Sequence, residues 1–257
     1  MKRIMLTVAY DGTAYSGWQI QPNAPTIEGE LNKAIYAVTG ENIQVIGASR
    51  TDAGVHAYGN IAVFDTQSTV PPDRFLYTVN RWLPPQIRVL HSCEVAADFH
   101  PRHCDTVKTY EYTILQSNIE LPQFYNRAWH VRGNLDIDSM KEAAAFLIGE
   151  HDFKSFCCVR TQAEHTIRTV YSIEILTESV NAVLDNTYLV KIKVTGNGFL
   201  YNMVRIITGT LVQVGKGQLL PQHIADILEK RERSAAGQTA PPQGLTLMEI
   251  KLCNKYV

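Results

Sequence analysis

Alternating apolar and polar residues predict that the chain begins with a β-strand. Every second residue of its first segment is apolar: Ile4, Leu6, Val8 and Tyr10. This spacing places the apolar side chains on one face of a strand. The next apolar stripe has helical spacing: Ile27, Leu31, Ile35 and Val38. Thr26 precedes this stripe and Gly40 follows it, and because these residue types commonly begin and end helices, we expect a helix between them.

The following residues continue with strands and a second helix. We expect strands near 42–48 and 60–66, and a helix that starts at 71–72 and stops at 84–85, where prolines cannot continue it. Residues 87–95 complete the series as a strand. The resulting order, β-α-β-β-α-β, is that of a ferredoxin-like unit, in which helices cover one face of an antiparallel sheet.

The second part of the chain repeats this order with longer elements. Strands are expected at 108–115, 166–176, 188–195 and 246–252. Helices are expected at 138–149, from 199 and from 221. We therefore predict an α+β protein with two ferredoxin-like halves, residues 1–105 and 106–257, whose antiparallel sheets lie side by side with helices on one face. Such an arrangement leaves a cleft between the halves, where ligands commonly bind.

The composition is that of a folded globular protein, since 45% of the residues are hydrophobic and 19% are charged. The 24 Lys and Arg residues nearly balance 25 Asp and Glu residues, so a site for a polyanion would depend on local clusters of positive charge. The five cysteines are odd in number and form no CxxC motif, which indicates reduced thiols and a cytoplasmic location. No apolar segment reaches the length that a membrane span requires.

Residues 49–59 would connect the two inner strands of the first half, and they carry more charge than a turn needs. Arg50, Asp52 and His56 all fall within this segment. Each residue taken alone suits a solvated turn, with Gly54 at a positive φ angle. Taken together, Arg50 near Asp52 would keep the carboxylate ionised and oriented. Such a carboxylate can act as a nucleophile or a general base, so Asp52 is the candidate catalytic residue.

Other catalytic signatures are weak or absent from the sequence. No second carboxylate matches the paired acids of glycosidases. The segment HPRHC at 100–104 contains histidines and a cysteine, but these residues are common without a metal, and we expect no metal site. GxSxG, Walker A and GxGxxG motifs are absent, which removes support for serine hydrolases, NTPases and dinucleotide-dependent enzymes.

The loop SRTDAGVHA at 49–57 resembles the catalytic loop of the TruA family of tRNA pseudouridine synthases. Further motifs resemble that family along nearly the whole chain: YDGTAYSGWQ (10–19), DFHPR (98–102), KTYEY (108–112), HDF (151–153), NGFLYNMVR (197–205) and APPQGLTL (240–247). The resemblance implies a cytoplasmic, homodimeric isomerase with two ferredoxin-like halves and no cofactor. It also implies a tRNA substrate, in which uridines 38, 39 and 40 of the anticodon stem-loop become pseudouridine.

The same resemblance assigns roles to individual residues. The catalytic Asp of the family matches Asp52, and the Arg two positions earlier matches Arg50. Tyr110 matches the tyrosine that stacks on the target base, and Arg205 matches the Arg that supports the catalytic carboxylate from the other half. Leu245 matches a residue that helps to line the pocket. Because an inward-facing Arg on an apolar helix needs an anion, we expect Arg205 to reach Asp52 across the cleft.

The chemistry of this reaction leaves three routes open. Pseudouridine formation breaks the C1′–N1 bond, turns the uracil and rejoins it through C5, which requires neither a redox cofactor nor a metal. The stacked uridine must first be flipped out. Asp52 could then attack C1′, attack C6, or abstract a proton on a route through a glycal.

Basic residues are expected to converge on one groove for the RNA. The candidates are Lys2, Arg3, Arg50, Arg74, Arg81, Arg88, Arg102, Lys108, Arg160, Arg168 and Arg205. Two alternative functions remain: a non-catalytic pair of RRM-like domains, which share the element order, and a synthase acting on other RNAs. The strand NIAVFDT at 60–66 lacks the aromatic pattern of an RRM, which disfavours the first alternative.

Overall fold

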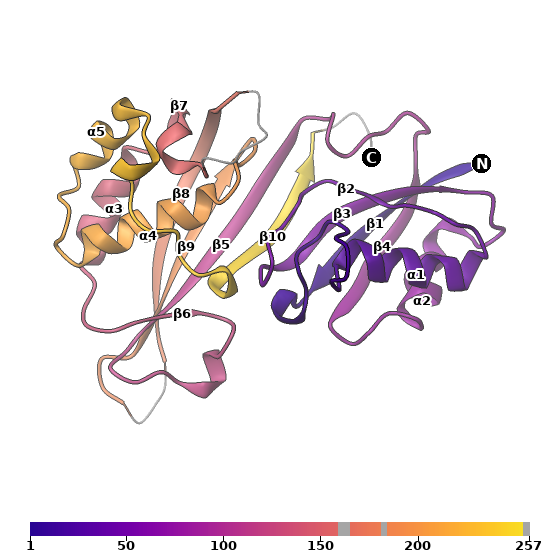
Figure 1. The fold of residues 1–257 in the computed structure, drawn as a ribbon, viewed down its shortest axis with the longest axis horizontal. Coiled ribbons are helices and arrows are strands. Elements are labelled where there is room, and N and C mark those ends of the chain that lie inside the picture. The colour runs from indigo at the N-terminus through magenta and orange to yellow at the C-terminus, as the bar shows by residue number, and fades with distance from the viewer. Residues whose placement is uncertain (159–164, 181–183, 254–257) are drawn as a thin grey trace. The chain divides into compact units, whose positions relative to one another are not determined.

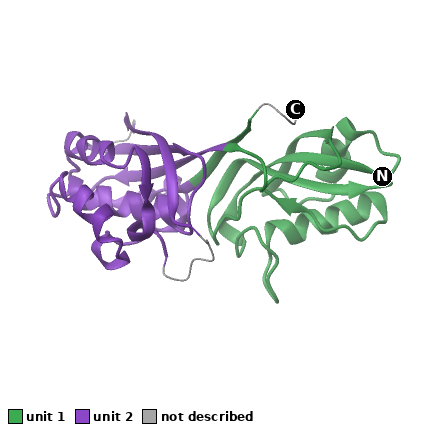
Figure 2. Cartoon of the chain, turned by 90° about the horizontal axis from the view of Figure 1, so that it is seen from above, with its two compact units in different colours: residues 1–106, 246–257 green, residues 107–245 purple. Residues whose placement is uncertain are grey.

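Two compact units make up the described part of the chain. The computed structural model describes residues 1–158, 165–180 and 184–253 (Figure 1). Contacts group residues 1–106 with 246–257 as unit 1, and residues 107–245 as unit 2 (Figure 2). Both units contain helices and strands, which confirms the α+β class. The C-terminal strand groups with unit 1, whereas the sequence predicts it in the second half.

Unit 1 follows the predicted element order and adds the C-terminal strand. Its elements are β1 (Lys2–Tyr10), α1 (Ile27–Thr39), β2 (Ile46–Gly47), β3 (His56–Thr66), α2 (Phe75–Asn80), β4 (Ile87–Val95) and β10 (Leu245–Leu252), which enters the unit at Thr246. The strand order is β4-β1-β3-β10, with β2 paired to β3. Strand β1 is antiparallel to β3 and β4, whereas β10 is parallel to β3. The sheet is therefore mixed, where the sequence predicts an antiparallel one.

Helix α1 has the ends that its sequence predicts. Thr26 Oγ1 accepts a hydrogen bond from the Gly29 N–H at 3.3 Å and so satisfies a donor of the first turn. Gly40 ends the helix with a φ of 73°, a conformation that glycine adopts without steric cost. The apolar residues of the buried face are Ile27, Leu31, Ala34 and Ile35.

The strand predicted near 42–48 is reduced to the two residues of β2. The Val45 N–H donates to Asn32 Oδ1 of α1 at 3.0 Å rather than to a neighbouring strand. The Glu41 carboxylate accepts a hydrogen bond from Thr66 Oγ1 at 2.9 Å, at the end of β3. The Asn32 side chain thus replaces strand pairing at Val45, because it satisfies a backbone donor that a sheet would otherwise pair.

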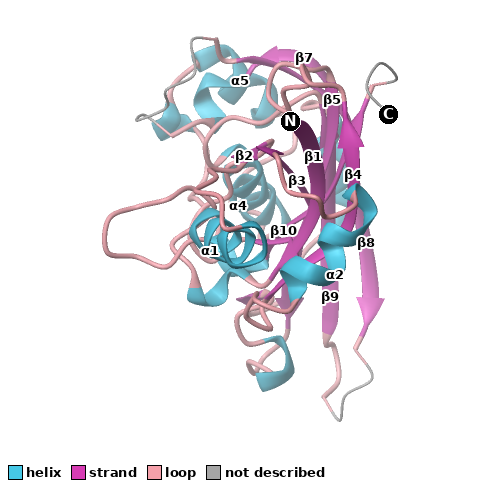
Figure 3. Ribbon diagram, turned by 90° about the vertical axis from the view of Figure 1, so that its right-hand side faces the viewer, coloured by secondary structure: helices cyan, strands magenta, loops and turns pink. Residues whose placement is uncertain are grey.

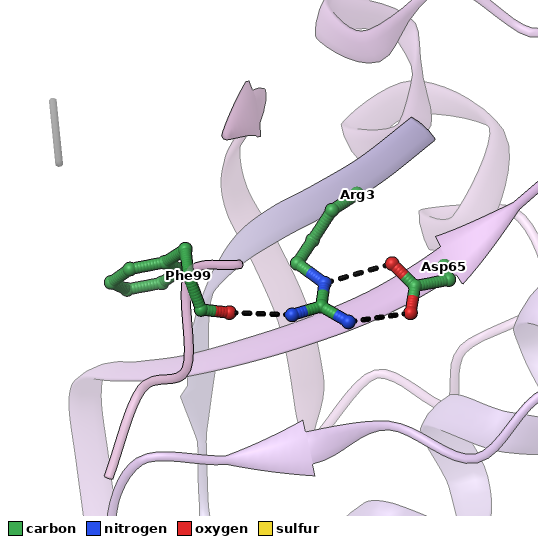
Figure 4. Close-up of polar contacts among 3 residues, drawn as sticks. All are labelled: Arg3, Asp65 and Phe99. Atoms are coloured by element: carbon green, nitrogen blue, oxygen red, sulfur yellow. Dashed lines mark hydrogen bonds and ion pairs between the residues drawn. The ribbon is translucent and has the colours of Figure 1, made fainter. Parts of the chain in front are cut away.

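An ion pair joins β1 to β3 and holds the segment that follows β4. Arg3 Nε and Nη2 donate to the two carboxylate oxygens of Asp65, at 2.8 and 2.6 Å, and Arg3 Nη1 donates to Phe99 O at 2.8 Å (Figure 4). Because this bidentate bond favours the ionised carboxyl, the pKa of Asp65 lies below its ordinary value. Arg3 therefore contributes to the folding of unit 1.

Unit 2 combines a series of four antiparallel strands with one short parallel strand. Its elements are β5 (Thr106–Gln116), β6 (Trp129–Val131), α3 (Ile137–Ala145), β7 (Gly149–Asp152), β8 (Ile167–Ser179), β9 (Tyr188–Gly196), α4 (Met203–Gly215) and α5 (His223–Lys230). The strand order is β5-β9-β8-β7, antiparallel at each pair, with β6 parallel to β5. Helices α4 and α5 lie on one side of β8 and β9 (Figures 1 and 3).

Helix α4 begins at Met203 rather than near residue 199. Asn202, directly before it, has a φ of 64°, which is the left-handed conformation and is incompatible with a right-handed helix. Most of α4 is buried, as its apolar stripe predicts. Among the helices of the described ranges, none is both long and apolar enough to cross a membrane.

Candidate active site

The Asp52 loop, residues 48–55, runs from the end of β2 to the start of β3. It is shorter than the predicted 49–59 because β3 begins earlier. The Asp52 carbonyl oxygen accepts a hydrogen bond from the Val55 N–H at 3.2 Å, and Gly54 between them has a φ of 79°. This is the turn that the sequence predicts, with glycine at the position where another residue would be strained.

The residues between β1 and α1 hold the Asp52 loop in place. The Trp18 N–H donates to Thr51 O at 3.0 Å, and the Gly54 N–H donates to Tyr15 O at 3.3 Å. Gly17 has a φ of 93°, and a Cβ at this position would lie 2.6 Å from Thr51 O. Gly17 is therefore required for the close approach. Sequence reasoning identified the motif that contains these residues but not its contact with the Asp52 loop.

Burial alternates along the Asp52 loop. Ser49 and Thr51 are buried, whereas Arg50 is exposed and Asp52 is partly exposed. The buried residues anchor the loop, while the two charged side chains remain accessible. The arrangement can therefore present the Asp52 carboxylate to a substrate.

His56, the first residue of β3, contacts the segment that follows β1. It is buried, and its Nδ1 accepts a hydrogen bond from the Gly12 N–H at 3.2 Å. The same nitrogen lies 3.2 Å from Asp11 Oδ1. The bond from the Gly12 N–H ties the start of β3 to the segment that follows β1, so His56 supports the C-terminal end of the Asp52 loop.

Tyr110 lies on β5, and a neighbouring aromatic residue holds its ring. The ring centroids of Tyr110 and Phe199 are 5.3 Å apart, and the rings are nearly perpendicular at 88°, which is a favourable edge-to-face geometry. Tyr110 is 7% exposed, so neighbouring groups cover most of its surface. Phe199 is a supporting residue that sequence reasoning missed, although it lies within the motif NGFLYNMVR.

Arg205 is oriented by groups of its own unit. Its Nε donates to Ala240 O at 2.8 Å, and its Nη1 donates to Asn202 Oδ1 at 2.8 Å. The Ala240 N–H in turn donates to Arg205 O at 3.1 Å. The left-handed conformation of Asn202 thus both begins α4 and places an acceptor for the guanidinium. The sequence predicts an anion for Arg205, and these two bonds already restrict the direction of its side chain.

The segment before β10 is held by Tyr112, a residue that sequence reasoning took only as part of an alternating strand. Tyr112 Oη donates to Pro241 O at 2.6 Å, and burial raises the pKa of this phenol above its ordinary value. The ring also packs against Gly244, where a Cβ would come within 2.6 Å of it. Leu245 follows directly and is buried at the start of β10.

The segment before β10 links Arg205 with Leu245 in unit 2, and Tyr110 lies on β5, the strand whose Tyr112 holds this segment. Tyr110 and Tyr112 alternate on β5 and so project from the same face. Arg205 bonds the start of the segment before β10, Tyr112 bonds its middle, and Leu245 ends it. Asp52 belongs to unit 1, and its predicted meeting with Arg205 stays a prediction.

The basic residues predicted to bind RNA fall into two groups. Some donate hydrogen bonds within their own unit: Lys2, Arg3, Arg88, Arg168 and Arg205. Others are exposed: Arg50, Arg74, Arg81 and Arg102. Lys108 is half-buried. Arg160 lies outside the described residues. The exposed group keeps its charge accessible to a polyanion, whereas the first group serves the local fold.

The HPRHC segment brings the rings of its two histidines into contact. The His100 and His103 rings lie edge to face with centroids 4.2 Å apart. Burial, followed by the proximity of His103, lowers the pKa of His100. Within residues 1–158, 165–180 and 184–253, no group of three His, Cys, Asp or Glu side chains is placed to hold a metal ion.

Comparison with known proteins identifies the family of this chain. A family model described as tRNA pseudouridine synthase matches residues 6–122 and 143–251. The tRNA pseudouridine synthase A of Brevibacillus brevis is 46% identical over 250 residues, which cover 97% of this chain and 99% of that protein. Proteins of the same name from Ruminiclostridium cellulolyticum and Caldicellulosiruptor bescii are 44% and 42% identical over the same shares. The chain therefore belongs to the tRNA pseudouridine synthase family of isomerases.

Proposed function

We propose that this protein converts uridine to pseudouridine at positions 38, 39 and 40 of the tRNA anticodon stem-loop, with Asp52 as nucleophile or general base on a flipped-out uridine. The observation that carries the proposal is the Asp52 loop, where a partly exposed carboxylate lies between backbone positions that are bonded to neighbouring segments. Family membership supports the reaction type and the tRNA substrate. The loop supplies a group that can perform the reaction.

The reaction itself makes no demand for a cofactor, and none takes part in the mechanism that we propose. The uracil is detached from C1′, turned and rejoined through C5, so no atoms or electrons are lost. The flipped-out base exposes both C1′ and C6 to Asp52. Attack at C1′, attack at C6 and proton abstraction through a glycal all use the same ionised carboxylate.

The other site residues then hold the base and the carboxylate. Tyr110 stacks on the uracil and keeps it in the pocket while it turns, with Phe199 fixing the direction of the Tyr110 ring. Arg50 and Arg205 favour the ionised form of Asp52, the second by reaching it from the other unit. Leu245 lines the pocket beside the base.

The proposed assembly consists of two ferredoxin-like halves with a cleft between them, in a cytoplasmic homodimer. The order of elements in unit 1, from β1 through α1, β2, β3 and α2 to β4, supports the first half. The exposed cations Arg50, Arg81 and Arg102 are proposed to face the RNA.

The test is conversion of unmodified tRNA transcript by the wild type and by Asp52→Asn, with pseudouridine mapped at each position. Wild type should modify positions 38, 39 and 40. Asp52→Asn should bind tRNA but react about 10²- to 10⁴-fold more slowly than the wild type, because an amide neither attacks nor accepts a proton. Asp73→Asn is the matched control, since it makes the same change at an exposed carboxylate of unit 1; it should react at the wild-type rate.

Each other outcome removes a part of the proposal. Conversion only at other uridines would contradict the anticodon stem-loop as the substrate. A wild-type rate in Asp52→Asn would remove Asp52 from the mechanism. A wild type that binds tRNA and converts no uridine would favour a binding module of the RRM type.

A further inference from the structure

A buried network of hydrogen bonds connects the Asp52 loop to β1 and β3, entirely within unit 1. Its members are Tyr10 at the end of β1, Ser49 and Thr51 in the loop, and Asn60 on β3. All are buried, and Asn60 is 0% exposed. Burying a polar group costs free energy unless the group is hydrogen-bonded. The partners of these four residues therefore show what holds the loop in place.

The hydrogen bonds form a chain that begins at the Asn60 amide. Asn60 Nδ2 donates to Ser49 O at 2.9 Å and to Tyr10 Oη at 3.2 Å, which uses both of its hydrogens. Asn60 Oδ1 accepts the Ile61 N–H at 3.0 Å. Because Tyr10 Oη accepts from Asn60, its own hydrogen can bond Thr51 Oγ1, which is 2.8 Å away.

The network holds the loop on both sides of Arg50 and up to Asp52. Asn60 bonds the residue before Arg50, and Tyr10 bonds the residue after it. Thr51, the direct neighbour of Asp52, is bonded twice, since its carbonyl oxygen also accepts the Trp18 N–H at 3.0 Å. The ring of Tyr10 packs against Trp18 with centroids 5.9 Å apart, which joins the two anchors.

We propose that Tyr10, Thr51 and Asn60 are positioning residues for Asp52, setting the direction in which its carboxylate meets the uridine. The inference rests on the proposed role of Asp52. These residues act through the loop backbone and do not touch the substrate. Apolar side chains of the same shape would fill this space, but only a network of directed bonds holds a loop to the accuracy that a reacting group needs.

The test compares variants that delete one hydroxyl and keep the volume. Tyr10→Phe and Thr51→Val should each lower the single-turnover rate at saturating tRNA transcript by about 10- to 100-fold, with the Kd for tRNA changed less than about twofold. Thr51→Ser retains the hydroxyl and should retain most of the rate. The double variant Tyr10→Phe/Thr51→Val should be little slower than the slower single variant, because both substitutions break the same bond.

Ser92→Ala is the structural control for these variants. Ser92 is a buried residue of unit 1 whose Oγ accepts the Leu76 N–H at 3.1 Å, away from the loop. This variant should lower the melting temperature and leave the rate unchanged. If Tyr10→Phe does not fold, the comparison of Thr51→Val with Thr51→Ser carries the test.

The outcomes separate this inference from the proposed function. Wild-type rates in Tyr10→Phe and Thr51→Val, with melting temperatures lowered as in Ser92→Ala, would show a purely structural network and overturn the inference. Asp52→Asn is measured in the same assay: if it is inactive while those variants are fully active, only the positioning role fails. If Asp52→Asn is itself fully active, the proposed function fails and the inference with it.

Discussion

The Trp18 N–H donates a hydrogen bond to the Thr51 carbonyl oxygen at 3.0 Å, so a motif near the N-terminus holds the residue next to Asp52. The Trp18 indole is buried, and it lies so close to Gly47 of β2 that a Cβ at this position would come within 2.4 Å of it. The Trp18 ring, from the segment after β1, thus packs directly against the backbone of β2. The motif YDGTAYSGWQ acts on the site by packing against the Asp52 loop.

Replacement of Gly17 by alanine should impair this packing. Gly17→Ala forces a positive φ on a residue with a Cβ and brings that Cβ against Thr51 O, so we expect a loss of about 1–3 kcal/mol in the free energy of unfolding. The rate of tRNA conversion should also fall, since Thr51 precedes Asp52. Denaturant unfolding and single-turnover kinetics measure the two effects.

The control for this change is Gly40→Ala. Gly40 also has a positive φ, 73°, but its Cβ would meet nothing within 4 Å. This variant should lose stability through backbone strain alone and keep the wild-type rate when it is folded. Equal rates in folded Gly17→Ala and Gly40→Ala would contradict the role of the Trp18–Thr51 contact.

The parts of this fold that depend on neighbours in sequence were predictable. Helix α1 begins after Thr26 and ends at Gly40 because both caps act on residues a few positions away. The turn at Asp52 and Gly54 is equally local. Arg50 and Asp52 could be identified as candidates for the same reason, because they are only two positions apart in the sequence.

The parts that depend on distant partners were not predictable from periodicity. Strand β2 is short because the amide side chain of Asn32 takes a backbone donor that strand pairing would have used. Tyr10 and Thr51 are 41 positions apart, and Tyr112 and Pro241 are 129 positions apart. An alternating pattern shows that such tyrosines are buried but does not show which group their hydroxyls bond.

Tyr112→Phe tests the hold on the segment before Leu245. The substitution removes the bond to Pro241 O and should lower the free energy of unfolding by about 1 kcal/mol at pH 7. Burial raises the pKa of the phenol in the folded state, so the unfolded state ionises first, near its ordinary pKa of about 10. The contribution of Tyr112 is therefore complete below that pH and is lost as the pH rises above it.

Urea unfolding of wild type and variant from pH 7 to pH 11 measures this dependence. The difference between them should shrink above about pH 10. Tyr125→Phe is the control, because Tyr125 is 67% exposed and should give little difference at any pH. A Tyr112→Phe difference that stays constant to pH 11 would show that the phenol does not ionise on unfolding in this range.

Binding of tRNA should weaken as salt concentration rises, because Lys and Arg side chains displace counterions from phosphates. Removal of one phosphate contact lowers the slope of log Kd against log salt by about 1. We expect this reduction for Arg102→Gln and Arg81→Gln, whose side chains are exposed. Lys33→Gln is the control, because Lys33 is an exposed cation outside the predicted set, and it should leave the slope unchanged. A wild-type Kd for tRNA that does not change with salt concentration would contradict a basic groove.

Two substitutions at Tyr110 separate the face of its ring from its hydroxyl. Stacking on uracil needs only the aromatic face, so Tyr110→Phe should keep the contact with the base, whereas Tyr110→Ala should lose about 1–3 kcal/mol of stacking. If the phenol also moves the C5 proton, Tyr110→Phe will bind tRNA normally and still fail to complete the reaction. Single-turnover conversion and tRNA affinity, measured for both variants, distinguish these roles.

Phe199→Leu completes this comparison. The Phe199 and Tyr110 rings pack nearly perpendicular to each other, with centroids 5.3 Å apart, so loss of the Phe199 ring should loosen the Tyr110 ring without removing its stacking face. We therefore expect a rate between those of the wild type and Tyr110→Ala, at similar melting temperature. If Tyr110→Ala converts tRNA at the wild-type rate, Tyr110 does not hold the base, and its burial against Phe199 serves only the packing of unit 2.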